Sequence, residues 1–535
     1  MKKHRKIGAA SKAVLLAWGL PALAGVSLTS IAYADDAAPA PAATAPAAAD
    51  AGAAATGTAV TTPPTSKVDK ARALVKRVEA EHAAATKASA SDAAAPGARV
   101  APEATTPNAV VNAEDKQAVE PPEFVSSQAK SHGLIQDSHL NFLFRNYTDM
   151  LDQKGGPHRH AWVLGAQANF ESGFTKGPIG FGFDASLYGA FKLDGGRGAG
   201  SMVHIAKGGG GSNQTAWAYP GIYDVKARVS ETVVKYGLHA VDNPFLEQHD
   251  NRALPPTFLG ASIVSNEFKN VMLEAGSFTK VDARGHTTLT NLTTSYGGTR
   301  IDRLTYLGGT WDFSSDGELA LYADQADDVW HQYYASVKQS IGSPKTVKLT
   351  GFGNVYSTHD TGDARQGKIN NNAYSLSIAA QHGPHELLVG YQQILGDQFF
   401  DYLNETNGIF LVNSMDVDYN GPHEKSLQLR YTFYGKEAGL PGFKALVWGL
   451  TGWGMDGSAG AAADPSHSSI YWANGAPVHG RHHEFGFIPS YTIQSGKLKD
   501  TKFTFMTMWH VGSSHTADPT SKMFRLVVKV PVKAF

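Results

Sequence analysis

The sequence has no cysteine and comparatively little charge. Without cysteine the chain has no disulfide, no thiolate nucleophile and no Cys ligand for zinc or an iron-sulfur cluster. Only 18% of the residues are charged, and 47 Lys plus Arg nearly balance 48 Asp plus Glu, which leaves a formal net charge of -1. A balanced charge gives no support to nucleic-acid binding. We therefore expect a fold held by non-covalent contacts, with no nucleic-acid partner.

Long apolar runs are also scarce. The only one, from Ala13 to Val26, follows several Lys and Arg residues and precedes the small-residue site Ala32-Tyr33-Ala34. This order is typical of a secretory signal peptide, so residues 1–34 are predicted to be removed on export. An uncleaved anchor is the weaker alternative, because Gly19 and Pro21 interrupt the run. No later segment approaches the roughly 18 to 20 uncharged residues of a membrane helix, which argues against a helical membrane protein.

Residues 35–130 are rich in Ala, Pro and Thr and have almost no aromatic side chains. Such a composition buries too little surface to offset the entropy of the chain, so we expect a linker. Within it, residues 66–85 place Val68, Ala71 and Val75 at helical spacing among Lys and Arg, which predicts a short helix. The alternatives for this helix are weak self-association and a solvated, transient state.

From residue 131 to residue 535 the sequence alternates between apolar and polar residues, with Gly, Asn and Asp clusters between the alternating segments. Between Ile179 and Phe191, for example, every second residue is apolar while Asp184 and Ser186 fall on the other face. A soluble β-sandwich also alternates. Three features favour a membrane barrel instead, namely strands of about nine to eleven residues, charged residues on the polar faces, and a final strand that ends near a terminal aromatic.

The length of this region limits the number of strands in the barrel. About 400 residues, at roughly 20 to 25 per strand and its turns, predict 16 to 18 antiparallel strands around an aqueous lumen. The C-terminus contains one irregularity, because Phe535 is out of phase with the outward set from Phe524 to Val532, and Pro531 lies inside the last strand. A bulge, or a strand that ends before Lys533, is expected there.

Enzyme and metal motifs are incomplete. His385-Glu386, His423-Glu424 and His483-Glu484 each lack the second His of a zinc-protease helix, and no Ser has the surroundings of a nucleophile elbow. The clusters at 158–160 and 479–483 contain several His, but a solvated loop is the favoured interpretation of both. We predict no catalytic residue, metal or cofactor, although a Ser/His/Asp set need not be local in sequence.

Charged residues on the polar faces form the most suggestive set. Fixed guanidinium groups in a water-filled lumen can bind a carboxylate and pass it on, which predicts an anion-guiding path. The alternative is that these charges pair across the pore and hold its cross-section. The residues are Arg145, Lys226, Arg228, Lys235, Arg430, Arg525 and Lys529, with the acids Asp184 and Glu171.

Several short motifs resemble the OprD-type outer-membrane porins, and they occur in the order of that family. The resemblance spans about residue 133 to the C-terminus. The motifs are Gly133-Leu134-Ile135-Gln136-Asp137-Ser138 with Leu143-Phe144-Arg145-Asn146-Tyr147; Gly180-Phe181-Gly182-Phe183-Asp184-Ala185 with Lys192-Leu193-Asp194; Asn251-Arg252-Ala253-Leu254-Pro255-Pro256-Thr257-Phe258; Gly390-Tyr391-Gln392 with Gly396-Asp397; Leu411-Val412-Asn413; and Ser426-Leu427-Gln428-Leu429-Arg430-Tyr431.

This resemblance implies an all-β, transmembrane antiparallel barrel of 18 strands in the outer membrane of a Gram-negative bacterium, in contact with its lipid and often a loose homotrimer. It implies passive diffusion of small carboxylate-bearing solutes such as amino acids, peptides or aromatic acids. It also implies that Asp242 to Thr257 folds inward as the constriction loop with Arg252 near it, and that Arg145 and Arg430 lie on lumenal faces. Combined with the charges on the polar faces described above, this gives a candidate path of Arg145, Asp184, Arg228, Arg252, Arg430 and Arg525.

Three other functions remain open for such a barrel. A hydrolase would carry its catalytic residues in the loops or at the rim. A general porin would have lumenal charges with only a structural role, and a structural or adhesive barrel would have a plugged lumen. We favour the selective channel, because the inward set contains more Arg and Lys than acid.

Deletion of residues 35–122 tests the linker interpretation. We expect the shortened protein to fold and to keep its conductance, because the deleted composition contributes no packed core. Single-channel recording of the purified protein in a planar bilayer checks this. Loss of the pore on deletion would show that the segment belongs to the barrel.

Overall fold

The computed structural model describes residues 127–154, 158–193, 216–407, 409–464, 466–467 and 469–535. The predicted signal peptide (1–34) and the predicted helix (66–85) lie outside the described residues, as does the linker up to residue 126. Gln128, three residues before the expected start of the barrel region, already packs into the fold. Its side chain donates to the carbonyl oxygens of Thr175 and Gly177, at 2.8 and 3.2 Å.

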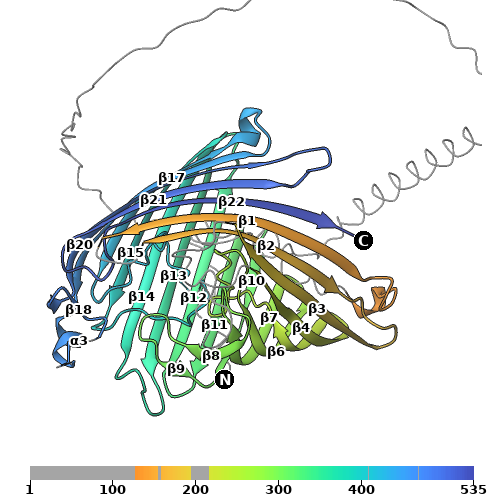
Figure 1. Ribbon diagram of the computed structural model, residues 1–535, viewed down its shortest axis with the longest axis horizontal. Helices are drawn as coiled ribbons and strands as arrows, with labels where there is room; N and C mark the ends of the chain where they lie inside the picture. The colour runs from red at the N-terminus through yellow and green to blue at the C-terminus, as the bar shows by residue number, and fades with distance from the viewer. Residues whose placement is uncertain (1–126, 155–157, 194–215, 408, 465, 468) are drawn as a thin grey trace, which may run out of the picture. The chain divides into compact units, whose positions relative to one another are not determined.

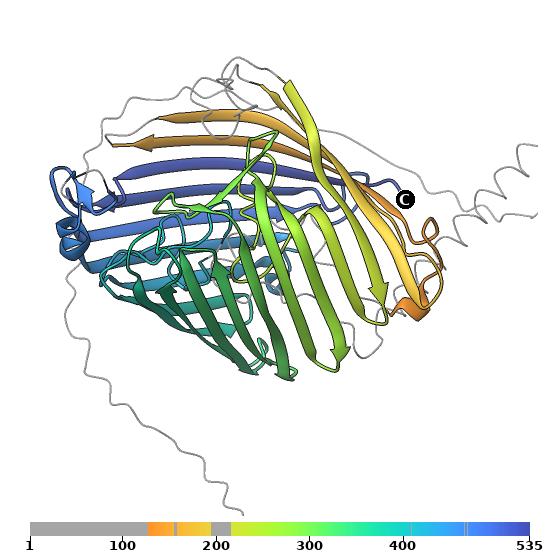
Figure 2. The same cartoon turned by 90° about the horizontal axis from the view of Figure 1, so that it is seen from below.

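Eighteen of the twenty strands in the main sheet form a closed antiparallel ring, seen from two directions in Figures 1 and 2. Consecutive strands pair around the ring, and the first strand pairs with the last to close it. The predicted 18-strand all-β barrel is therefore confirmed. Its strands are β1 (His139–Gln153), β2 (Arg159–Glu171), β3 (Ile179–Lys192), β4 (Ala216–Val229), β5 (Thr232–His239), β6 (Thr257–Phe268), β7 (Val271–Asp282), β10 (Leu304–Ser314), β11 (Gly317–Ala326), β12 (Trp330–Gly342), β13 (Lys348–Asp360), β14 (Asn370–His382), β15 (His385–Leu395), β16 (Lys425–Tyr434), β17 (Phe443–Asp456), β20 (His479–Thr492), β21 (Lys502–Gly512) and β22 (Ser521–Lys533).

Several short strands and helices lie outside the ring of eighteen strands. Strands β8 (Leu289–Thr293) and β9 (Arg300–Ile301) branch from the end of β7, and β18 (Trp472–Ala473) pairs with β19 (Ala476–Pro477) in a separate hairpin. The short helices are η1 (Gln128–Lys130), η4 (Gly435–Ala438) and α3 (Ser458–Ala462). Among the residues that the structure describes, no helix is long and apolar enough to cross a membrane.

The two-residue alternation sorts side chains between the outside and the lumen. In β3, Phe181 and Leu187 are 58% and 57% exposed, whereas Asp184 and Tyr188 on the opposite face are buried. Strand β16 repeats the pattern, with Leu429 exposed and Arg430 buried. A barrel with an apolar outer face and polar groups inside suits a lipid bilayer, since lipid solvates the apolar side chains.

The C-terminal strand is more regular than expected. Strand β22 continues to Lys533 without a register shift against β1, so the predicted bulge or early strand end is wrong. Pairing with β21 ends at Lys529. Pro531 therefore lies where only one neighbouring strand is paired, a position that tolerates its missing N–H. Phe535 follows the strand and is exposed, which explains its different phase.

A second loop besides the predicted one folds into the barrel. Both leave the end of the ring opposite to the C-terminus, because β5 and β15 run in the same direction as β1 and antiparallel to β22. The loop at residues 240–256 contains the predicted inward segment Asp242 to Thr257 except Thr257, which begins β6, and it places Phe245 in a buried cluster with inward tyrosines of β11, β12 and β13. The second loop, residues 396–424, contributes Phe400 and Leu403 to the same cluster. Much of the core thus lies within the lumen.

Substitution of a lipid-facing residue tests the assignment of the outer face. Leu429→Arg should lower the free energy of unfolding by about 2–4 kcal/mol, because it places a charge in the hydrocarbon layer. Leu429→Ala is the matched control and removes only apolar contact. Urea unfolding in phospholipid vesicles, followed by tryptophan fluorescence, measures both. Equal effects of the two substitutions would contradict a lipid-facing Leu429.

Candidate functional site

A cavity of about 300 Å³ lies where the two inward loops approach the barrel wall. Loops 240–256 and 396–424 supply two of its sides, and the inward faces of β1, β21 and β22 with loop 513–520 supply the rest. Its polar lining comprises Gln153, His249, Asn251, Arg252, Tyr402, Asn407, Ser414, Asp416, Asp418, Asp518, Ser521 and Arg525. The cavity lies between the inward loops and the inner wall of the barrel, where its polar groups can contact a solute inside the lumen.

Two of the predicted residues, Arg252 and Arg525, line this cavity together. Arg525 is held from β22 by its Nε, which donates to Asp149 Oδ1 of β1 at 3.0 Å. His249 adds no charge, because burial and then Arg284 and Arg252 hold its pKa well below the usual value. The positive charge of the cavity therefore resides on arginines at neutral pH.

Acidic residues line the same cavity from loops 396–424 and 513–520. Asp418 accepts hydrogen bonds from the hydroxyl groups of Tyr296 and Tyr402, at 2.8 and 2.9 Å, and from Ser414. These contacts fix the shape of the second loop. Burial raises the pKa of Asp518 to about 6 against the opposing effect of His482, so Asp518 is mainly ionised at pH 7.

Arg145 anchors the first loop to the wall. Its Nη1 and Nη2 donate to the two carboxylate oxygens of Asp250, each at 2.6 Å, and Nη1 also donates to the Arg252 carbonyl oxygen at 2.5 Å. Lys529 Nζ lies 4.0 Å from Asp250. On β2, a Cβ at Gly165 would overlap the Ala253 carbonyl oxygen, so glycine lets the loop approach closely. The geometry gives Arg145 a positioning role beside the cavity.

Arg284 connects the two inward loops. It follows β7, and its Nε donates to Glu405 Oε2 of the second loop at 2.7 Å, while its Nη1 donates to Asn251 Oδ1 of the first at 2.5 Å. Burial opposes ionisation of Glu405, but Arg284 outweighs it and holds the pKa of this carboxyl below its usual value. The ion pair therefore persists at neutral pH and fixes the distance between the loops.

Asp184 and Arg228 belong to a different cluster, away from the cavity lining. Asp184 on β3 pairs with Lys226 Nζ at 2.8 Å and with Lys235 Nζ at 3.0 Å. Arg228 donates from Nε to Gln128 Oε1 at 2.9 Å and lies 4.1 Å from the centre of the Phe174 ring. Asp184 thus pairs with two inward lysines, in line with the alternative that pairing holds the cross-section.

Arg430 differs from the other predicted residues. It is 4% exposed on the inward face of β16, and its Nε and Nη1 have no hydrogen-bond partner among the described residues. Both side-chain amide atoms of Gln428, two residues earlier on the same face, are also unpartnered within that part of the chain. Buried donors without partners are costly, so these groups are expected to hydrogen-bond with water or a solute in the lumen.

The sequence did not identify several residues that build this site. Asp149 shares the two-residue alternation of Arg145 and could have been found from it. Asp250, Arg284 and Glu405 carry no such signal, because they lie in loops and their partners are more than a hundred residues away or on another loop.

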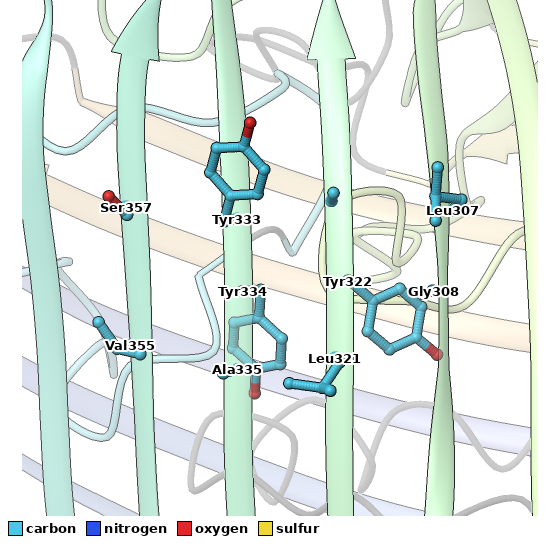
Figure 3. A pocket seen from close by; sticks show the side chains of 10 residues that line it. Leu307, Gly308, Leu321, Tyr322, Tyr333, Tyr334, Ala335, Val355 and Ser357 are labelled. Atoms are coloured by element: carbon cyan, nitrogen blue, oxygen red, sulfur yellow. The ribbon is translucent and has the colours of Figure 1, made fainter.

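A second hollow lies on the outer wall and is unrelated to the lumen. It has a volume of about 390 Å³ over strands β10 to β13 and is lined by apolar side chains (Figure 3). Leu307, Leu321 and Tyr333 among them are more than half exposed, which places the hollow on the lipid-facing side. We therefore exclude it from the solute path.

The His-rich segments form no chelating arrangement. No group of three or more His, Asp or Glu side chains within the described ranges is placed to hold a metal ion. His158 contacts the exposed Asp152 at 2.8 Å, and His479 stacks on His515 with ring centres 4.9 Å apart. The predicted solvated loop is wrong for 479–483, because these residues begin β20 and the His482 side chain is buried.

Comparisons with known proteins agree on one family. Residues 132–534 match the family model described as outer membrane porin, OprD family. Porin D of Pseudomonas aeruginosa is 33% identical over 426 residues, which are 76% of this chain and 94% of that protein. The crystal structure of Pseudomonas aeruginosa OccD3 (OpdP) is similar with a TM-score of 0.69 at 33% identity, covering 79% of this chain and 98% of that chain. The structure of Pseudomonas aeruginosa OpdK with vanillate has a TM-score of 0.66 at 25% identity, over 75% of this chain and 100% of that chain.

Breaking the anchor of the first loop tests its positioning role. Asp250→Asn should release loop 240–256 from β1, since loss of one partner of a buried ion pair costs about 3–5 kcal/mol. We expect a larger single-channel conductance and entry of larger neutral sugars in liposome-swelling assays. Asp302→Asn, at an exposed ion pair with Arg365, is the matched control. An unchanged size limit in Asp250→Asn would contradict the anchor.

Proposed function

Because the chain belongs to the OprD family of outer membrane porins, we propose that its lumen passes small carboxylate-bearing solutes selectively and by passive diffusion. The protein is an outer-membrane channel of Gram-negative bacteria, and its similar proteins are porins. We also propose that the solute follows the candidate path predicted from the sequence. The proposal includes the loose homotrimer that the family resemblance implies.

One observation carries the carboxylate preference, namely the placement of Arg252 and Arg525 on the cavity between the inward loops and the barrel wall. A guanidinium binds a carboxylate through two parallel hydrogen bonds, whereas a neutral solute of the same size gains no such contact. Arg430 supports this preference from a second position on the wall, because two of its donors have no partner among the described residues. A carboxylate that moves through the lumen can accept hydrogen bonds from those two donors.

The acids of the cavity refine the solute class. Asp416 and Asp518 line the same cavity as the arginines. A solute with both a carboxylate and a cationic group, such as an amino acid or a short peptide, can contact both kinds of charge. The related OpdK structure contains vanillate, an aromatic carboxylate, which supports the acid-binding half of this proposal.

A hydrolase with its active site at the rim is the alternative from another class. Such an enzyme needs a nucleophile, a base and an orienting acid within hydrogen-bond reach of one another. The buried His482–Glu424 pair provides a base and an acid, but in the described part of the chain no Ser hydroxyl donates to this histidine. We therefore prefer the channel.

Solute uptake by liposomes that contain the purified protein tests the proposal. A small carboxylate, its neutral amide and a cation of equal size are compared. We expect the carboxylate to enter faster than the amide, because only the carboxylate is attracted by the cavity arginines. Equal entry of all three would indicate a general porin with structural charges, and no entry would favour the enzyme or a plugged barrel.

Two variants test whether Arg252 and Arg430 cause the carboxylate preference. Arg252→Gln and Arg430→Ala should each lower carboxylate uptake by about tenfold to a hundredfold, since a charged hydrogen bond contributes roughly 1.5–3 kcal/mol, and should leave neutral-sugar uptake nearly unchanged. Arg300→Gln removes the same charge at an exposed ion pair with Asp302 and is the control. Equal loss of both solutes would mean that these arginines shape the pore without selecting.

A further inference from the structure

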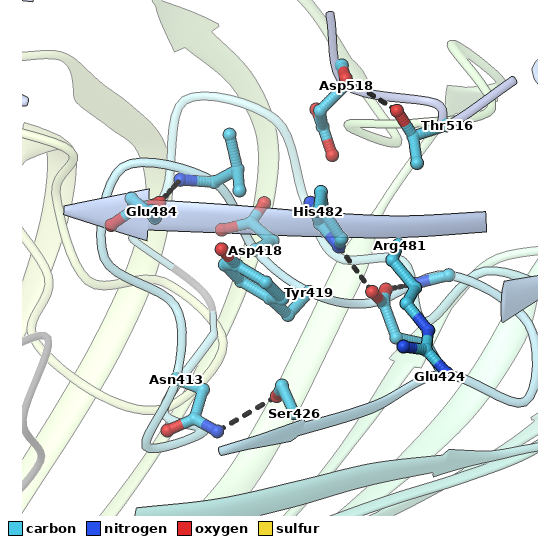
Figure 4. Close-up of polar contacts among 12 residues, drawn as sticks. Asn413, Asp418, Tyr419, Glu424, Ser426, Arg481, His482, Glu484, Thr516 and Asp518 are labelled. Carbon is cyan, nitrogen blue, oxygen red and sulfur yellow. Dashed lines mark hydrogen bonds and ion pairs between the residues drawn. The ribbon is translucent and has the colours of Figure 1, made fainter. Parts of the chain in front are cut away.

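A chain of buried hydrogen bonds connects the second inward loop to loop 513–520 through two histidines of the wall. His510 Nδ1 donates to the Pro519 carbonyl oxygen at 2.9 Å. His510 Nε2 lies 2.8 Å from His482 Nδ1, and His482 Nε2 contacts Glu424 Oε1. Glu424 Oε2 accepts from the Gly421 backbone N–H at 3.0 Å, within the loop itself. Figure 4 shows His482 directed at Glu424.

The direction of each hydrogen bond fixes the number of protons. A carbonyl oxygen only accepts, so His510 carries its proton on Nδ1 and a neutral His510 accepts at Nε2. His482 must then donate from Nδ1, which leaves Nε2 of a neutral His482 as a bare lone pair. A bare lone pair and an ionised Glu424 would repel each other. The contact therefore requires one additional proton, shared by His482 and Glu424.

The surroundings keep this proton out of water. His482 and His510 are fully buried, Glu424 is 1% exposed, and the Tyr419 ring stacks on His482 with centres 4.1 Å apart. The titratable groups that face the pair from its neighbours are His483, Asp416, Asp418, Tyr419, Glu484, His510 and Asp518. Burial raises the pKa of Asp518 to about 6, so this acid is largely ionised above pH 7 and favours retention of a nearby proton.

The same contact holds the cavity wall in place. Glu424 is the last residue of the second inward loop. Glu484 holds an earlier part of this loop, because its carboxylate accepts hydrogen bonds from the backbone N–H groups of Asp416 and Val417 at 3.1 and 3.0 Å. Asn413 is tied by its amide to Ser426 Oγ at 2.9 Å. The segment between these anchors carries Asp416 and Asp418, which line the cavity. Its position depends on these polar contacts and on Gln392 of β15, whose Nε2 donates to the carbonyl oxygens of Asp418 and Tyr419 at 3.1 and 2.9 Å.

We propose that the proton shared by Glu424 and His482 locks loop 396–424 to the barrel wall, so that these two residues are positioning residues of the constriction. As the pH rises and this proton is lost, the carboxylate and the neutral imidazole repel and the segment before Glu424 moves more freely. The consequence is a pH-dependent constriction. This inference rests on the channel assignment but not on a preference for carboxylates.

Glu424→Gln tests the lock. A glutamine amide can donate to the bare Nε2 of a neutral His482 while its oxygen accepts from Gly421, so the variant needs no shared proton. In planar bilayers with KCl as the only electrolyte, we expect the open-channel current variance of the native protein to rise about threefold or more between about pH 7 and pH 10. In Glu424→Gln the variance should stay flat over that range.

Two further variants control the measurement. In His510→Gln the amide can replace both hydrogen bonds of His510 and leaves the shared proton in place, so the transition should persist. His515→Gln removes a rim histidine and should also leave it unchanged. A transition retained in Glu424→Gln would assign the titration to another group, and a flat native profile would overturn the lock outright. Since KCl current is the readout, neither outcome depends on carboxylate selectivity.

Discussion

Closure of the sheet is the constraint on which the rest of this structure depends. A backbone N–H or C=O that faces hydrocarbon without a partner is very costly, so a sheet in a bilayer cannot have a free edge. The antiparallel pairing of β1 with β22 removes that edge, although the two strands lie at opposite ends of the barrel region. Once the ring is closed, alternate side chains are assigned to lipid or to the lumen, and the polar residues have only the lumen to occupy.

The lumen in turn replaces the core of an ordinary soluble domain. Eighteen strands enclose more space than inward side chains fill, and the two inward loops occupy part of the remainder. Burial of Phe245 and Phe400 against inward tyrosines stabilises these loops, while ion pairs such as Arg284–Glu405 fix where they stop. Apolar contacts thus bring the loops inside, and a few charged contacts determine the dimensions of the opening between them.

The sequence predicted the parts of this arrangement that depend on local order. Period-two alternation placed Asp184 and Arg430 on inward faces, and family motifs identified the first inward loop around Arg252. Contacts across the lumen were not predictable, because Arg145 and Asp250 are 105 residues apart and no local pattern couples them. The second loop was missed because its apolar residues resemble those of a strand. The roles of the six path residues remain predictions.

Asp250 has a consequence for assembly. Arg145 of the first strand and Lys529 of the last are direct cross-strand partners at the seam, and like charges in that position repel. The Asp250 carboxylate contacts both, so it offsets part of this repulsion when the loop is docked and the register is correct. A slip of one residue would turn one of these cations toward lipid. We therefore expect docking of the loop to stabilise the correctly registered ring relative to misaligned ones.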